Sequence, residues 1–140
     1  MSKEPLDPAK AERARRAFAS VPYARLLGME LGALESGEAS THLTVRDDLR
    51  QNQGVVHGGA IASLIDTAAA ISLLTQIDLQ ERVTTTDLTI HYLRPVTTGR
   101  ITATARVVRQ GQRLMVLNVE VTNDQQLCLA TAVTGYIKLQ

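Results

Sequence analysis

The sequence predicts an α+β domain in which a curved, mostly antiparallel six-stranded sheet wraps around one long central helix, with an extra N-terminal helix. Within residues 58–77, Asp66 is the only ionisable side chain among Gly, Ala, Ile, Leu, Ser, Thr and Gln. A helix that is apolar on every side is a buried one. About six segments with strand-like patterns accompany this helix, and a sheet can bury it only by curling around it.

The segments before the central helix have first a helical pattern and then a strand-like one. Residues 8–20 begin with Pro8, which favours the first turn of a helix, and continue with good helix formers. A further helical turn is expected near residues 23–27. From residue 29 the pattern alternates with a period of two, which predicts a strand over 29–33 and a returning strand over 39–45.

The segments after residue 82 all have strand patterns. Residues 84–93 are rich in β-branched side chains and end before Pro95, which ends a strand or keeps it at a sheet edge. Residues 101–108 and 117–122 alternate apolar and polar side chains. Residues 127–139 are apolar on both faces, which predicts a strand with neighbours on both sides.

The composition excludes several classes of protein. Of 140 residues, 15 are Lys or Arg and 14 are Asp or Glu, and the aromatic content is 3% without Trp. This balance gives no basic surface and no stacking platform for nucleic acid. Residues 58–77 form a long run that is nearly free of charged side chains. This run contains Asp66 together with Ser and Thr, which argues against a membrane span. The N-terminal residues lack the apolar segment of a signal peptide, so we expect a cytoplasmic protein without nucleic-acid or membrane partners.

The central helix carries the features that suggest chemistry. Burying a carboxylate is costly, and proteins often keep such a group for a reaction. Gly58 and Gly59 begin the helix, where free N–H groups and the helix dipole favour an oxyanion. An acid and an anion site together suggest attack on a carbonyl group. The simpler alternatives are that Asp66 bonds a neighbour such as Ser63, and that the glycines only allow close packing.

The motifs around these residues resemble those of the hotdog-fold acyl-CoA thioesterases, in the branch named after the phenylacetate-pathway thioesterase. Residues 54–59 read Gly-Val-Val-His-Gly-Gly, with Asp66 nine residues after the His. Residues 87–95 read Asp-Leu-Thr-Ile-His-Tyr-Leu-Arg-Pro and match the D-x-x-x-x-Y-x-x-P strand of that family. The likeness implies a hotdog domain over residues 25–140, preceded by an N-terminal helical extension over residues 1–24.

The resemblance also implies roles for individual residues. Asp66 would be the nucleophile or the general base, and the Gly58 N–H would polarise the thioester carbonyl. Thr85 falls where relatives often have a Ser or Thr that hydrogen-bonds the attacking water or the acid. Relatives commonly have an Asn six residues before the His, where this chain has Gln51. Either Gln51 supplies the amide from a longer stem, or a shifted loop lets Asn52 take over.

The remaining candidates are assigned from chemistry. His57 completes the candidate catalytic set, and we expect it to hydrogen-bond the loop and fix the start of the helix. Gly59 is a candidate for substrate binding, as are three arginines that would meet the CoA phosphates: Arg94, Arg109 and Arg113. The three His residues lack zinc-ligand spacing, so no metal is expected. No cofactor is expected either, since CoA is part of the substrate.

Helix geometry predicts a site shared between subunits. Gly58 and Asp66 are eight residues apart, hence ~12 Å along a helix at 1.5 Å per residue. Both groups must lie about 3 Å from one reacting carbonyl. We therefore expect a homodimer with two equivalent sites, and a pair of such dimers as in relatives. The alternative functions are a non-catalytic acyl-CoA-binding hotdog protein and an acyl-thioester hydratase or dehydratase.

Overall fold

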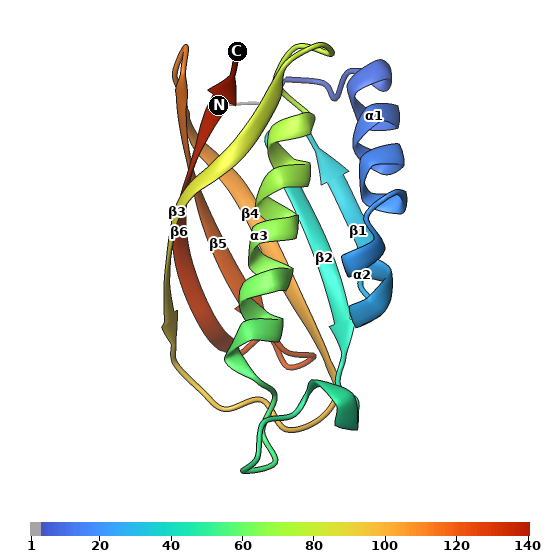
Figure 1. The fold of residues 1–140 in the computed structure, drawn as a ribbon, viewed down its shortest axis with the longest axis vertical. Coiled ribbons are helices and arrows are strands. Elements are labelled where there is room, and N and C mark those ends of the chain that lie inside the picture. The colour runs from blue at the N-terminus through green and yellow to red at the C-terminus, as the bar shows by residue number, and fades with distance from the viewer. Residues whose placement is uncertain (1–3) are drawn as a thin grey trace.

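The computed structural model describes residues 4–140. The helices are α1 (Pro8–Ala19), α2 (Pro22–Leu27) and α3 (Gly58–Leu74), and the strands are β1 (Glu30–Glu35), β2 (Glu38–Thr44), β3 (Arg82–Tyr92), β4 (Arg100–Gln110), β5 (Leu114–Thr122) and β6 (Cys128–Leu139). Figure 1 shows α3 lying across the concave side of the sheet, with α1 and α2 on one flank. The predicted long helix, six strands and N-terminal helix are confirmed.

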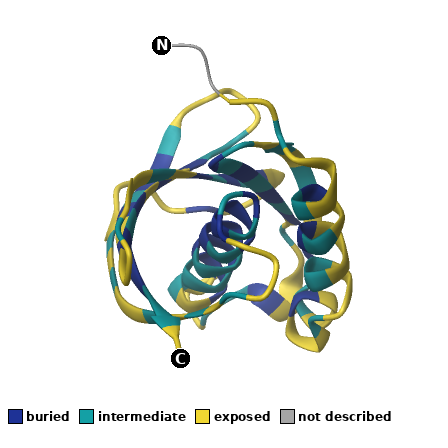
Figure 2. Cartoon of the chain, turned by 90° about the horizontal axis from the view of Figure 1, so that it is seen from above, coloured by how far each residue is buried: buried dark blue, intermediate teal, exposed yellow. Residues whose placement is uncertain are grey.

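The strands form one antiparallel sheet in the order β1-β2-β4-β5-β6-β3. As predicted, the C-terminal strand β6 is internal, because it pairs with β5 on one side and β3 on the other. Seen from above, the sheet is an incomplete ring around α3 (Figure 2). Within the described residues, β1 and β3 are the edges of this sheet, so the ring stays open between them.

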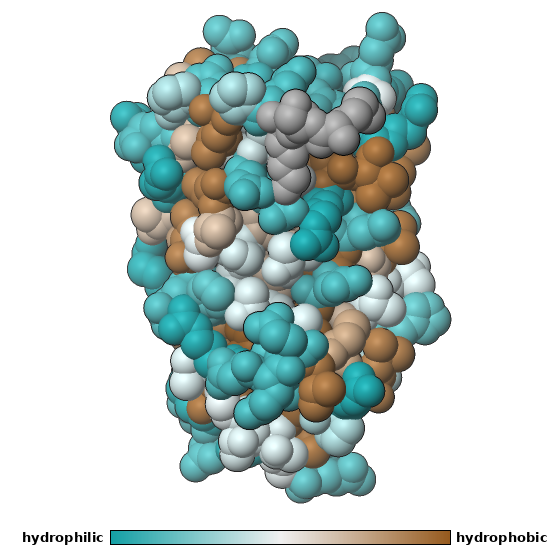
Figure 3. All heavy atoms as spheres, turned by 180° about the vertical axis from the view of Figure 1, so that it is seen from behind, coloured by the Kyte–Doolittle hydropathy of each residue, from teal (hydrophilic) through white to brown (hydrophobic). Residues whose placement is uncertain are grey.

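The core fills the space between α3 and the inner face of the sheet. The buried positions of β4 and β5 alternate with exposed or half-buried ones, as a period of two requires. On α3, Leu64 and Ile65 are completely buried, and truncating such a side chain to Ala typically costs about 2–5 kcal/mol. The outer face of the sheet, seen from behind in Figure 3, is largely hydrophilic with smaller apolar patches.

One stripe of α3 departs from the expectation that the helix is buried on every side. Ala62, Asp66, Ala70 and Leu74 follow one another at four-residue spacing, and all are only half-buried. The reason is the open sheet, since the edge strands β1 and β3 do not meet over this side of the helix. The sequence pattern alone does not reveal this stripe, because Ala and Leu occupy it as they occupy the core. Asp66 is therefore half-buried, and the prediction that it is buried is wrong.

The N-terminal helices are fastened to the end of α3. Arg13 of α1 donates hydrogen bonds to the main-chain oxygens of Leu74 (2.6 Å), Ile77 (2.7 Å) and Asp78 (2.5 Å). The Leu74 oxygen is one of the carbonyl groups that the end of a helix leaves without an intrahelical partner. Helix α3 ends at this residue, three positions before Ile77, where the run expected to form the helix ends. The proposed division of the chain after residue 24 stays a prediction.

Candidate functional site

Asp66 lies halfway along α3 and is held by hydroxyl groups from two strands. Its Oδ1 accepts a hydrogen bond from Thr85 Oγ1 of β3 at 2.9 Å and another from the Tyr136 hydroxyl of β6 at 2.6 Å. Thr85 and Tyr136 are paired across the antiparallel ladder, so their side chains emerge on the same face of the sheet. As expected, Thr85 lies close to the acid. Asp66 also has a second hydrogen-bond partner, Tyr136.

Tyr136 is the member of this cluster that the sequence analysis missed. Its side chain is only 2% exposed. Burial raises the pKa of Tyr136, and the charge of the Asp66 carboxylate raises it further, so the phenol stays protonated and acts as a donor. The sequence did contain a signal for this residue, since Tyr136 is a tyrosine in a strand predicted to be apolar on both faces. A buried tyrosine hydroxyl usually requires a hydrogen-bond partner.

The second carboxylate oxygen of Asp66 is free to react. Within residues 4–140, Oδ2 accepts no hydrogen bond, whereas Oδ1 accepts two. Asp66, Thr85 and Tyr136 line a cavity of about 280 Å³. Most of the other lining side chains are apolar: Ala17, Val21, Ala70, Ile71, Leu74 and Val83. The arrangement offers a carboxylate base or nucleophile beside a space suited to an apolar group.

Gly58 opens the same helix at its N-terminal end. His57 is the N-cap residue, and its Nδ1 accepts a hydrogen bond from Gly59 N at 2.7 Å. The expectation that His57 fixes the helix start is confirmed. The amide N–H of Gly58 has no acceptor within residues 4–140, and it lies at the positive end of the helix dipole. It can therefore serve an anionic oxygen of a ligand.

A side chain at position 58 would crowd the ring of Tyr92. Tyr92 of β3 donates its hydroxyl hydrogen bond to Gly58 O at 2.8 Å. A Cβ added to Gly58 would lie 3.2 Å from Cζ and the hydroxyl oxygen of that ring. A side chain at this position would therefore displace Tyr92 by a few tenths of an ångström, so the packing of Tyr92 favours glycine here.

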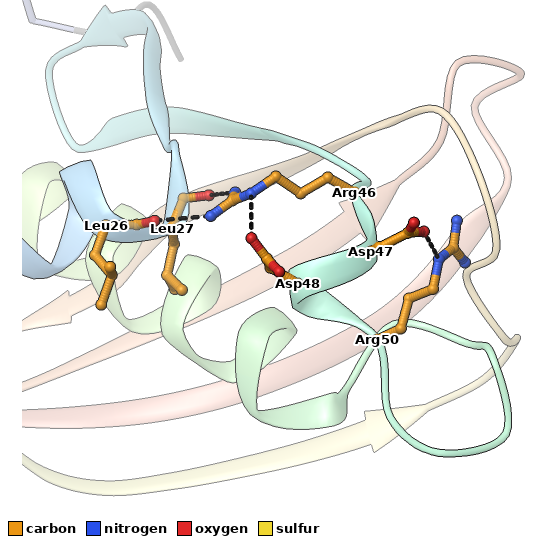
Figure 4. A network of polar contacts seen from close by, with 6 residues as sticks. All are labelled: Leu26, Leu27, Arg46, Asp47, Asp48 and Arg50. Carbon is orange, nitrogen blue, oxygen red and sulfur yellow. Dashed lines mark hydrogen bonds and ion pairs between the residues drawn. The ribbon is translucent and has the colours of Figure 1, made fainter.

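The loop before α3 is held in place by two arginines. Arg50 pairs with Asp47 at 3.1 Å and donates hydrogen bonds to Gly54 O at 2.7 Å and Thr97 O at 2.8 Å. Arg46 donates hydrogen bonds to the main-chain oxygens of Leu26 and Leu27 at the end of α2 (Figure 4). These bonds tie the loop both to α2 and to the segment after β3, so they fix the position of Gly58.

The candidates around Gly58 share a second cavity, of about 300 Å³. Gln51 and Arg94 line it together with Gly58 and Tyr92. Asn52 is exposed on the loop and is not among the lining residues, so the structure brings Gln51, rather than Asn52, close to Gly58.

The other two arginines lie elsewhere. Arg109 is near the end of β4 and Arg113 lies just before β5, in the hairpin next to the C-terminal end of β6. In Figure 1 this hairpin is at the opposite end of the sheet from the start of α3. Their contact with CoA phosphates stays a prediction. Among residues 4–140, no three His, Cys, Asp or Glu side chains are grouped so as to hold a metal ion.

Together the curled sheet and the long helix that it wraps define a hotdog-fold protein, with Asp66 and the Gly58 amide as its candidate site groups. The family model described as the thioesterase superfamily matches residues 53–130, which is more than half of the chain. The chain therefore belongs to the thioesterase superfamily, as the resemblance of its motifs predicted.

Individual relatives agree with this assignment. The chain is 33% identical over 132 residues to the medium/long-chain acyl-CoA thioesterase YigI of Escherichia coli, covering 84% of this chain and 85% of the relative. It is 33% identical over 108 residues to the acyl-coenzyme A thioesterase PaaI of the same organism, covering 76% and 75%. The solved structure of E. coli PaaI superposes with a TM-score of 0.87 at 29% identity over 94% of this chain and 95% of PaaI.

The helices of residues 4–140 include none that combines the length and the apolar character needed to cross a bilayer. The cytoplasmic location and the absence of nucleic-acid partners stay predictions.

Proposed function

We propose that the protein hydrolyses acyl-CoA thioesters at a site formed by Asp66 of one subunit and the Gly58 amide of another. The observation that carries this proposal is the Asp66 cluster. Two hydroxyl groups hold Oδ1, Oδ2 accepts no hydrogen bond within residues 4–140, and Asp66 lines a largely apolar cavity. Membership of the thioesterase superfamily supports the reaction type, and the similarity to the acyl-CoA thioesterases YigI and PaaI supports acyl-CoA as the substrate.

In the general-base form of this reaction, Asp66 Oδ2 takes a proton from water as the water oxygen bonds to the thioester carbonyl carbon. The carbonyl oxygen becomes an oxyanion that accepts a hydrogen bond from the Gly58 N–H, a contact typically worth about 3–4 kcal/mol. The carbon–sulfur bond then breaks, and the CoA thiolate leaves and receives the proton from Asp66. The acyl group is released as the acid.

In the nucleophilic form, the Asp66 carboxylate attacks the carbonyl carbon itself. The carbon–sulfur bond breaks, the CoA thiolate leaves and takes a proton from solvent, and the acyl group stays on Asp66 as an anhydride. Water then hydrolyses the anhydride to the free acid and the Asp66 carboxylate, and a proton returns to solvent. The two forms differ in the origin of the oxygen atoms in the product. A single turnover in isotopically labelled water places the label in the released acid for the general-base form. For the nucleophilic form, attack of water on the Asp66 carbonyl places the label in the protein.

The shared site is supported by the arrangement along β3. The residues near Asp66 include Thr85, towards the start of this strand, whereas the residues near Gly58 include Tyr92, at its end. Strand β3 has a neighbour, β6, on only one side within the described residues. Antiparallel pairing of this free edge with a second copy would bring the Thr85 end of one strand beside the Tyr92 end of the other. We expect a homodimer of this kind and association of two such dimers.

The decisive experiment measures thiol release from purified protein with short-, medium- and long-chain and aromatic acyl-CoAs. We expect Asp66→Asn to lower kcat by about 10²–10⁴-fold, the usual contribution of a general base. Asp124→Asn, which changes an exposed loop acid, serves as the matched control and should retain full activity.

Three results would contradict the proposal. Equal activity of the wild type and Asp66→Asn would remove Asp66 from the reaction. Tight binding of the substrates without turnover would instead indicate a non-catalytic acyl-CoA-binding protein. An enoyl thioester formed without release of thiol would indicate a dehydratase.

A further inference from the structure

The Tyr136 hydroxyl is placed against two oxygen atoms of the same residue. It lies 2.6 Å from Asp66 Oδ1 and 2.9 Å from the main-chain oxygen of Asp66. The ring is almost completely buried, and its strand β6 is held by β5 and β3 on either side. The donor is therefore fixed relative to both the helix backbone and the carboxylate.

We propose that Tyr136 is a positioning residue for Asp66, which holds Oδ1 together with Thr85 so that Oδ2 is the oxygen that reacts. This inference rests on the proposed thioester hydrolysis. A freely rotating carboxylate would present either oxygen in many directions, whereas an anchored one keeps a single oxygen at the cavity.

Packing alone does not account for the contact with the carboxylate. A buried tyrosine hydroxyl requires an acceptor, and the main-chain oxygen of Asp66 already supplies one. The phenol has a single hydrogen to donate, and Oδ1 is the nearer of its two acceptors, at 2.6 Å against 2.9 Å. Because a hydrogen bond to a charged group is about twice as strong as a neutral one, the hydroxyl serves the carboxylate in preference to the backbone.

The test compares kcat and KM of the wild type and Tyr136→Phe, which keeps the ring and removes the hydroxyl. We expect kcat to fall about ten- to a hundredfold, the usual effect of losing a hydrogen bond to a charged group, with KM changed by less than about twofold. This split between kcat and KM distinguishes a positioning role from a general loss of structure, which would change both parameters.

The matched control is Tyr23→Phe. The Tyr23 hydroxyl lies 2.9 Å from Ser63 Oγ on the same helix, but Tyr23 is 51% exposed and does not contact Asp66. Removing the Tyr23 hydroxyl should change neither kcat nor KM. An unchanged kcat in Tyr136→Phe, in an enzyme that Asp66→Asn inactivates, would overturn the positioning role and leave the proposed function intact.

Thermal unfolding shows whether Tyr136→Phe keeps its fold, so that a loss of turnover can be told from a loss of structure. We expect this variant to unfold cooperatively and to melt somewhat below the wild type, because one hydrogen bond is lost while the ring stays packed. A variant that is folded at the assay temperature and still turns over at the wild-type rate would overturn the role.

Discussion

Gly58 and Asp66 lie on the same helix, yet they line two different cavities of the chain. Gly58 shares its cavity with Gln51 and Arg94, and Asp66 shares its own with Thr85 and Tyr136. The rise of an α-helix separates the two residues by ~12 Å along the axis. The shared site proposed above would combine the Asp66 cavity of one chain with the Gly58 cavity of a second copy.

Mixing two inactive variants tests the shared site. Gly58→Val would press a branched side chain against Tyr92, since a Cβ alone already lies 3.2 Å from that ring, and Asp66→Asn removes the acid. A heterodimer of these variants has one intact site and one doubly altered site. We expect each variant to be inactive and an equal mixture of refolded chains to regain about a quarter of wild-type activity, as random pairing in a two-fold dimer requires.

The control for this experiment is the double variant that carries both substitutions, mixed with wild type. A shared site leaves every such heterodimer inactive, whereas a site within one chain leaves it half active. Activity that follows the second pattern would exclude the shared site.

The bond between Thr85 and Asp66 should contribute to turnover. Thr85→Val preserves the shape of the side chain but removes the hydroxyl that donates to Oδ1 at 2.9 Å. We expect kcat to fall about ten- to a hundredfold, because hydrogen bonds to charged groups are typically worth about 1.5–3 kcal/mol. Thr89→Val, at an exposed position of the same strand, is the control. Similar activities of the two variants would argue against this role of Thr85.

The wall that α1 contributes to the Asp66 cavity should limit the length of the acyl group. Ala17 lines this cavity, and Ala17→Leu would fill part of it. We expect kcat/KM for long-chain acyl-CoAs to fall about tenfold or more, since even one methylene group is worth about 1–3 kcal/mol in such a pocket, while short-chain substrates are little affected. Ala19→Leu changes an exposed position of the same helix. Chain-length profiles that superimpose for both variants would locate the acyl group elsewhere.

The fastening of α1 to the end of α3 should be a stability feature. Arg13→Met keeps much of the apolar stem and removes the donors to three carbonyl oxygens. We expect the free energy of unfolding to fall by about 2 kcal/mol, the scale of charged hydrogen bonds lost to partly buried acceptors. Urea denaturation followed by circular dichroism measures the change. Arg15→Met, at an exposed position, is the control, and equal midpoints for the two variants would contradict the prediction.

Much of the site was within reach of the sequence because its signals are local. A lone acid in an uncharged helix, and a His-Gly-Gly motif before it, identify Asp66 and Gly58 without reference to distant residues. Thr85 required the family resemblance, which implied its role from its place beside the strand motif. Tyr136 was missed, since it approaches Asp66 only through the pairing of β6 with β3, and its own segment reads as an ordinary apolar strand.

The sequence by itself determined the elements, the wrapped helix and the thioesterase family, because periodicity, turn residues and short motifs depend on neighbouring positions. Only the tertiary structure decided that the sheet stays open beside α3, that Asp66 is half-buried there, and that Tyr136 and Thr85 bind the same carboxylate oxygen. These features depend on strand order and register. Strand register brings together residues far apart in the chain, and no local pattern encodes which pair will meet.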